Sequence, residues 1–174
     1  MPATKTAFST RPTLASATPS FLFGRESEEL EQTIFEKIRE RAYLLFEQSG
    51  REPGNEDANW SRAESEILRS GVHVRESGSW VALSFSIPDA SGEGMQIAVR
   101  PTRVVVRTRV ASNEREASEG AKQDEREIFL AANLAAEVDP GSAAASFRDH
   151  SLHLMIKKSR PDKLAGNQDT QPND

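Results

Sequence analysis

The feature that most limits the possible folds of this chain is a run of short alternating segments near its C-terminus. Residues 126–158 read as three short strands, separated by an Asp-Pro-Gly turn at 139–141 and an Arg-Asp-His-Ser corner at 148–151. Two further apolar runs, 80–87 and 95–110, precede this stretch. Several short strands at this spacing predict an immunoglobulin-like β-sandwich, so the expected fold class is mainly β.

The faces of the strands follow from the alternation of side chains. Met95, Ile97 and Val99 alternate with Gln, Ala and Arg, which predicts a strand with one buried face. The apolar centre of residues 103–110 predicts a strand covered on both faces. We expect the sandwich to span residues 71–158.

A helical pattern precedes the sandwich. Apolar residues recur three or four positions apart between Leu30 and Leu45, which predicts a helix over 27–48. A Pro/Gly loop follows, and a second helix is expected over 58–69. Together the two helices form a hairpin domain over 27–70.

This hairpin is too small to be stable alone. Its apolar face buries too little area to offset the ordering entropy of about 40 residues. It must therefore dock on another surface, in the same chain or on a second subunit. The candidate docking residues are Ile38, Tyr43 and Trp60.

Both ends of the chain have low-complexity sequences. Residues 1–26, rich in Ser, Thr, Ala and Pro, are expected to form a disordered arm that carries Phe8, Phe21 and Phe23. The arm has no acidic residue before its final position, which superficially resembles an organelle transit peptide, and it lacks the apolar segment of a secretory signal. Residues 159–174 are expected to form a disordered tail.

Composition narrows the possible partners. The formal net charge is −5, which argues against nucleic acid, because phosphate binding needs a basic face. No apolar run approaches the roughly 20 residues that span a bilayer, so no membrane partner is expected. The chain has no cysteine, which suits a reducing cytoplasm.

No constellation of side chains predicts catalysis. His73, His150 and His153 are poorly placed for a metal site, because residues three apart on one strand point to opposite faces. Glu64 and Glu66 project in different directions from a helix. Neither a Gly-rich phosphate loop nor a Ser-His-Asp elbow is visible. We expect no cofactor, no metal and no enzymatic activity.

Two resemblances follow from ordered motifs. The strand region resembles the α-crystallin domain of small heat-shock proteins, and the hairpin resembles a short bacterial domain of unknown function. The first resemblance rests on Trp80, Ile87-Pro-Asp89, Met95 to Val99, Val104 to Val106, Asn133-Leu-Ala-Ala-Glu-Val-Asp-Pro140 and Ala145 to Leu154. The second rests on Ile38-Arg-Glu-Arg-Ala-Tyr43, Gly50-Arg-Glu-Pro-Gly54 and Trp60 to Glu66.

The chain also departs from the α-crystallin pattern. His150 and Ser151 replace a Gly-Val pair, and Ala135 replaces a proline. Residues 159–174 contain no Ile-x-Ile or Ile-x-Val, the tail element that docks into a neighbouring dimer in that family. The loop 111–125 lies where many bacterial members exchange a strand, but it lacks residues that pair well.

The resemblance implies an ATP-independent chaperone, a holdase that binds partly unfolded proteins and prevents their aggregation. It also implies a homodimer or a small homo-oligomer. The alternative is an adaptor or co-chaperone-like module that grips one defined partner. The candidate client-binding residues are Phe8, Phe21 and Phe23 on the arm, and Ile97, Val99, Ala145 and Phe147 in a groove between two strands. The alternative for the last four is that they belong to the sandwich core, as alternating apolar residues on strands usually do.

Overall fold

The structure, a computed structural model, describes residues 18–69, 71–111 and 125–160. Phe8, most of the loop 111–125 and the tail beyond residue 160 lie outside these ranges. The predictions made for them therefore stay predictions.

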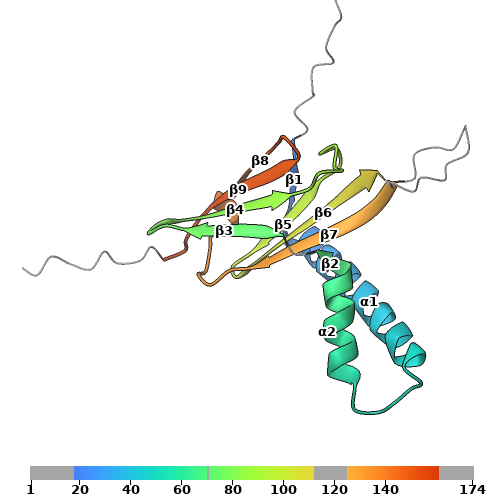
Figure 1. The fold of residues 1–174 in the computed structure, drawn as a ribbon. Coiled ribbons are helices and arrows are strands. Elements are labelled where there is room, and N and C mark those ends of the chain that lie inside the picture. The colour runs from blue at the N-terminus through green and yellow to red at the C-terminus, as the bar shows by residue number, and fades with distance from the viewer. Residues whose placement is uncertain (1–17, 70, 112–124, 161–174) are drawn as a thin grey trace, which may run out of the picture.

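Two packed β-sheets and a helical hairpin make up the described chain (Figure 1). Sheet A contains, in spatial order, β1 (Ser20–Leu22), β5 (Gln96–Arg100), β6 (Arg103–Ala111), β7 (Glu125–Asn133) and β2 (Leu68–Arg69). Sheet B contains β3 (Val72–Glu76), β4 (Trp80–Ser86), β9 (Ser151–Lys157) and β8 (Ala144–Arg148). The helices are α1 (Gly24–Gln48) and α2 (Glu56–Ile67), and a short 3-10 turn, η1 (Pro140–Ser142), precedes β8. The predicted mainly β sandwich with a preceding helical hairpin is confirmed.

The sandwich interior is formed by alternate residues of the two sheets. On β4 and β9 every second side chain is buried, so each of these strands has one face in the core. Met95, Ile97 and Val99 are buried on the predicted inward face of β5. The prediction that this strand has only one buried face is wrong, because Ala98 is buried on the other face, beneath α1. From sheet B the core receives Val81, Leu83, Phe85, Leu152, Leu154 and Ile156.

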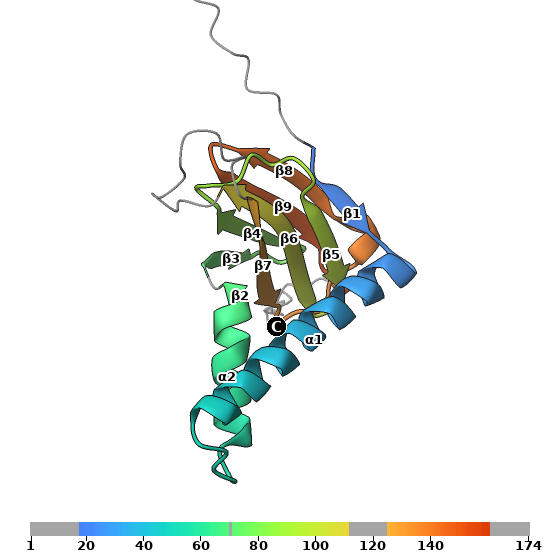
Figure 2. The ribbon, with the colours of Figure 1, turned by 90° about the vertical axis from the view of Figure 1, so that its right-hand side faces the viewer.

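The helical hairpin docks in cis, on the outer face of sheet A (Figure 2). A second buried cluster joins Leu30, Ile34 and Ile38 of α1 to Ala98, Val105 and Phe129 of the sheet. This explains why three consecutive valines of β6 are fully buried: Val104 and Val106 face the sandwich interior, whereas Val105 faces the helices. The prediction that this strand is covered on both faces is confirmed.

Both edges of sheet A are formed by short strands that flank the hairpin. Residues 20–26 were predicted to belong to a disordered arm, but they form β1 and the first turn of α1, which begins at Gly24 instead of residue 27. The second helix was predicted to continue to Arg69, but it ends at Ile67, because Leu68 and Arg69 pair in parallel with β7. The short strands on either side of the hairpin therefore belong to sheet A of the sandwich.

A two-residue turn joins β8 to β9. Arg148 pairs with Ser151, and the two residues between them, Asp149 and His150, have φ angles of 49° and 58°. Two central residues with positive φ are typical of a type I′ hairpin turn. His150 thus occupies a backbone conformation that glycine adopts at lower cost.

Candidate functional site

The edge of β5 is the place where the structure differs most from the sequence-based expectation. Three residues of β1 pair with it in parallel, and Phe21 lies opposite Ile97. The backbone N–H of Ser20 donates to the carbonyl oxygen of Met95 at 2.9 Å, and the Ser20 hydroxyl donates to the same oxygen at 3.1 Å. An edge that would otherwise expose unpaired backbone groups is therefore occupied in cis.

Side chains of β1 point in turn to the two buried clusters. Phe21, on the same face as Ile97, is half-buried against the sandwich core. Leu22, next to Ala98 in register, packs against the cluster between α1 and sheet A. Phe23 is 56% exposed, and its ring centroid lies 6.2 Å from that of Phe21.

The four residues predicted to line a groove between β5 and β8 differ in their exposure. Ala145 and Phe147 of β8 are half-buried against the same core that Phe21 contacts. Ile97 and Val99 are only 0% and 7% exposed, so the structure places them in the sandwich core, and a role for them in client binding stays a prediction. The physical reason for their burial is that β1 covers the edge of β5, while these two side chains point between the sheets.

Sequence reasoning missed β1 because three residues are too few to show a period. The neighbouring residues Phe21 and Leu22 are both apolar, and each faces a different cluster in the structure. A pair of adjacent apolar residues beside a polar Ser20 is the only local signal for this strand.

The three predicted docking residues of the hairpin lie in different surroundings in the structure. Ile38 is buried between α1 and sheet A, and the half-buried Trp60 contacts the cluster and stacks against Phe35 with a centroid distance of 5.2 Å. Tyr43 is 57% exposed and does not dock, because it lies on the side of α1 turned away from the sheet. Its hydroxyl donates to the carboxylate of Glu47 at 2.9 Å, and this hydrogen bond raises the pKa of Tyr43.

Ion pairs hold the two helices together and to the sheet. Glu66 of α2 accepts hydrogen bonds from Arg41 of α1 and from Arg62, and these bonds, that of Arg41 first, hold the pKa of Glu66 below its ordinary value. At the sheet, Glu127 accepts a hydrogen bond from Arg107 and lies 3.9 Å from the ammonium group of Lys37. Exposed pairs of this kind contribute little individually, so the apolar cluster supplies most of the docking energy.

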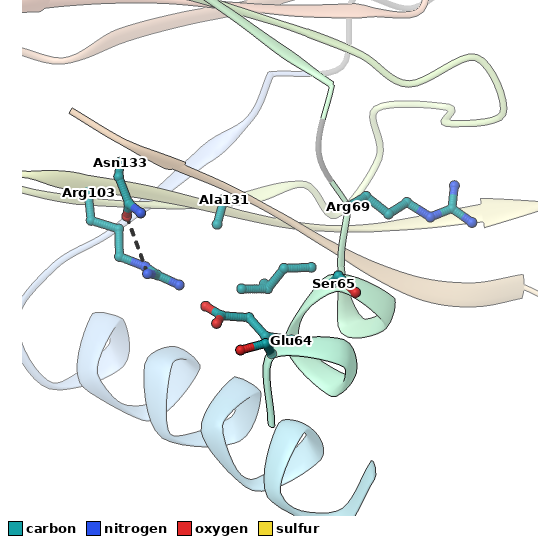
Figure 3. Close-up of a pocket in the computed structure, with 8 residues that line it drawn as sticks. Glu64, Ser65, Arg69, Arg103, Ala131 and Asn133 are labelled. Atoms are coloured by element: carbon teal, nitrogen blue, oxygen red, sulfur yellow. Dashed lines mark hydrogen bonds between the residues drawn. The ribbon is translucent and has the colours of Figure 1, made fainter. Parts of the chain in front are cut away.

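A polar pocket lies beside this junction (Figure 3). It has a volume of about 290 Å³ and lies between α2 and the ends of β6 and β7. Arg103 donates from Nη1 to the Oδ1 atom of Asn133 at 3.3 Å, and Glu64 reaches into the pocket from α2. The pocket is lined by one acidic side chain, Glu64, by two basic ones, Arg69 and Arg103, and by the hydroxyl groups of Ser61 and Ser65. No histidine lies among these lining residues to activate a serine hydroxyl.

The three histidines do not come together. His73 and His153 lie on the outer face of sheet B, on either side of Ser84, and His150 lies in the β8–β9 turn. Within residues 18–69, 71–111 and 125–160 there is no group of three or more His, Cys, Asp or Glu side chains that could hold a metal ion. None of the helices in these ranges combines the length and the apolar character that a membrane span requires.

Each comparison with known proteins matches only part of the chain. Residues 36–69 match the family model described as protein of unknown function DUF2934. A curated relative, ATP synthase subunit b 2 of Albidiferax ferrireducens, is 42% identical over 48 residues, which are 28% of this chain and 15% of that protein. This chain thus matches only a small part of that relative.

Solved structures that are similar to the chain include small heat-shock proteins. Heat shock protein 16.0 from Schizosaccharomyces pombe is 16% identical, with a TM-score of 0.45 and coverage of 55% of this chain and 92% of that one. The hspA protein from Xanthomonas axonopodis is also 16% identical, with a TM-score of 0.42 and coverage of 52% and 93%. The chain is similar to small heat-shock proteins with an α-crystallin domain, and its hairpin matches a family of unknown function.

Proposed function

We propose that the protein is an ATP-independent chaperone that binds partly unfolded proteins where β1 now lies. The observation that supports this proposal is the edge of β5: a strand of only three residues covers it, directly over a large apolar core. A holdase needs apolar surface and a way to expose it, and it needs no reactive group.

Displacement of β1 would create a site suited to an extended chain. The free edge of β5 offers backbone hydrogen bonds, and the space left by Phe21 offers an apolar pocket beside Ala145 and Phe147. A client segment that adds to this edge would gain affinity from the backbone and selectivity from an alternating apolar side chain. Phe21 is the residue of this chain that such a client side chain replaces.

A reversible covalent lock tests this function. Ser20 and Gln96 are directly opposite in the β1–β5 pair, and neighbouring strands lie about 4.8 Å apart, within the range that a disulfide bridges. The chain has no cysteine of its own, so Ser20→Cys with Gln96→Cys forms one defined disulfide. We expect the oxidised protein to lose most of its suppression of client aggregation and the reduced protein to regain it.

A second lock serves as the matched control. Ser86 and Ser151 are opposite each other in the β4–β9 pair, which belongs to sheet B and does not include β5. Oxidation of Ser86→Cys with Ser151→Cys should leave aggregation suppression unchanged. If the oxidised β1–β5 lock protects clients as well as its reduced form does, client binding does not require release of β1.

The breadth of clients separates the chaperone from an adaptor. A holdase suppresses the aggregation of several unrelated proteins at near-stoichiometric ratios, whereas an adaptor enriches one partner and protects none of the others. A cytoplasmic location and a homodimer or small homo-oligomer belong to this proposal. The first is supported by the absence of cysteine from the sequence. The second is supported by the outer edge of β3 in sheet B, which pairs with no other strand among the described residues.

A further inference from the structure

The outer face of sheet B carries a trough that no helix covers. Its floor is formed by Ala82 and Ser84 of β4, which are small. Its walls are larger side chains of the two neighbouring strands, and the trough has a volume of about 410 Å³. The wall residues are His73 and Arg75 from β3 and His153 and Met155 from β9.

This face is basic and partly apolar. Arg75, Arg148 and Lys157 point outward from it, because each is paired with an outward-facing residue of the neighbouring strand. No acidic residue of β3, β4, β8 or β9 points to the same side, since the single acid of these strands, Glu76, is opposite the buried Val81. Met155 is 44% exposed beside the floor of the trough.

The hairpin presents a complementary stripe on the side of α1 that faces away from sheet A. Tyr43 and Leu44 are 57% and 42% exposed there. Glu40 lies three and four residues from them and four residues from Glu36, and such residues share a helix face. Glu47 lies on the same face, but its carboxylate is paired with Arg51 at 2.8 Å. Residues 24–67 contain 12 acidic and 6 basic side chains, so the hairpin is acidic although the trough is basic.

We propose that the trough of one copy receives the Tyr43–Leu44 stripe of a second copy. The two surfaces cannot meet within one chain, because Leu30, Ile34 and Ile38 fix α1 on the outer face of sheet A, whereas the trough lies on the outer face of sheet B. The hairpin also extends beyond the sandwich (Figures 1 and 2), which leaves its far half accessible to a neighbour.

A contact of this kind joins two different surfaces, so it is heterologous. Each copy that donates its hairpin still has an empty trough, and association therefore continues from copy to copy until a ring closes or the concentration limits it. The mass of the assembly should rise with protein concentration. It should fall with added salt, because screening weakens the attraction between the acidic stripe and the basic trough.

Two variants distinguish this heterologous contact from a symmetric contact, in which both copies use the same surface. Leu44→Lys places a positive charge in the donor stripe and keeps the trough, whereas Met155→Glu places a negative charge in the trough and keeps the donor. Each variant alone should show no growth of mass with concentration by light scattering. An equimolar mixture should have a larger mass than either variant alone, because the intact stripe of one variant can enter the intact trough of the other.

The control changes an apolar side chain that is exposed, as Leu44 and Met155 are, but lies outside both surfaces. Phe23→Glu changes an exposed apolar residue outside the stripe and should associate like the unchanged protein. Circular dichroism of each variant verifies that it is folded. The proposal is overturned if the mixture behaves like the separate variants, or if the mass of the unchanged protein does not depend on concentration or salt.

Discussion

At the residue scale, the backbone decides which side chains are buried and which residues must adopt a positive φ angle. Leu154 and His153 are neighbours on β9, but Leu154 is fully buried between the sheets and His153 is exposed on the outer face of sheet B. The alternation of side chains along a strand accounts for both positions. By contrast, nothing in the local sequence marks His150 as a residue with a positive φ angle, because Asp-His is not a typical turn pair.

Replacement of Leu154 by Asp tests the core. The substitution would place an unpaired carboxylate among apolar side chains, so the free energy of unfolding should fall by about 3 kcal/mol or more. Chemical denaturation measures this change. His153→Asp, on the exposed face of the same strand, should change the stability by less than about 0.5 kcal/mol, and equal effects of the two variants would contradict the assigned strand faces.

Replacement of His150 by Gly tests the β8–β9 turn. The φ angle of 58° disfavours a side chain by about 1 kcal/mol, and glycine avoids that cost. The free energy of unfolding should therefore rise by up to about 1 kcal/mol. Asp89→Gly is the control, since Asp89 has no positive φ angle and gains nothing from glycine. A lower melting midpoint for His150→Gly would contradict a strained turn.

At the element scale, the hairpin and its two flanking strands contact sheet A at both edges and on its outer face. The strand β1 covers the β5 edge, α1 covers the outer face, and β2 pairs with β7 at the opposite edge. The ion pairs of Glu66 then hold α2 against α1. This arrangement explains why a hairpin too small to be stable alone is ordered here.

The Glu66 ion pairs predict a pH dependence of stability. Arg41 and Arg62 lower the pKa of Glu66 in the folded protein, so its contribution is present above the ordinary glutamate pKa and is lost as the pH falls through the lowered value. Glu66→Gln should therefore lose less stability than the unchanged protein on acidification from about pH 5 to pH 3. Thermal unfolding across this range measures the difference. Glu64→Gln, a carboxylate of the same helix outside these ion pairs, should behave like the unchanged protein.

At the scale of the whole molecule, assembly depends on which sheet edges are still open. In the described chain, sheet A has β1 and β2 at its edges, whereas β3 and β8 of sheet B have unpaired outer edges. The edge of β5 is taken by β1 of the same chain. Contacts between copies should then form through sheet B and the hairpin.

Removal of the tail tests this expectation. A chain ending at Lys158 should have the same mass by light scattering as the full chain, because residues 159–174 contain no Ile-x-Ile motif and the β5 edge is occupied. The cis pairing of β1 serves as the internal check, since the Ser20→Cys and Gln96→Cys lock should leave this mass unchanged as well. Assemblies of a dozen or more subunits that collapse on truncation would show that the tail links dimers after all.

The sequence by itself determined the sandwich, the hairpin and the buried faces of their longer elements. Alternation on β4, β5 and β9 and the helical period of α1 extend over enough residues to be visible without any neighbour. Only the tertiary structure decided what lies at the edges and on the outer faces. β1 and β2 are three and two residues long, and they are strands only because β5 and β7 supply their hydrogen-bond partners. Such pairing is a contact between residues about 60 or more positions apart, and no local pattern can specify it.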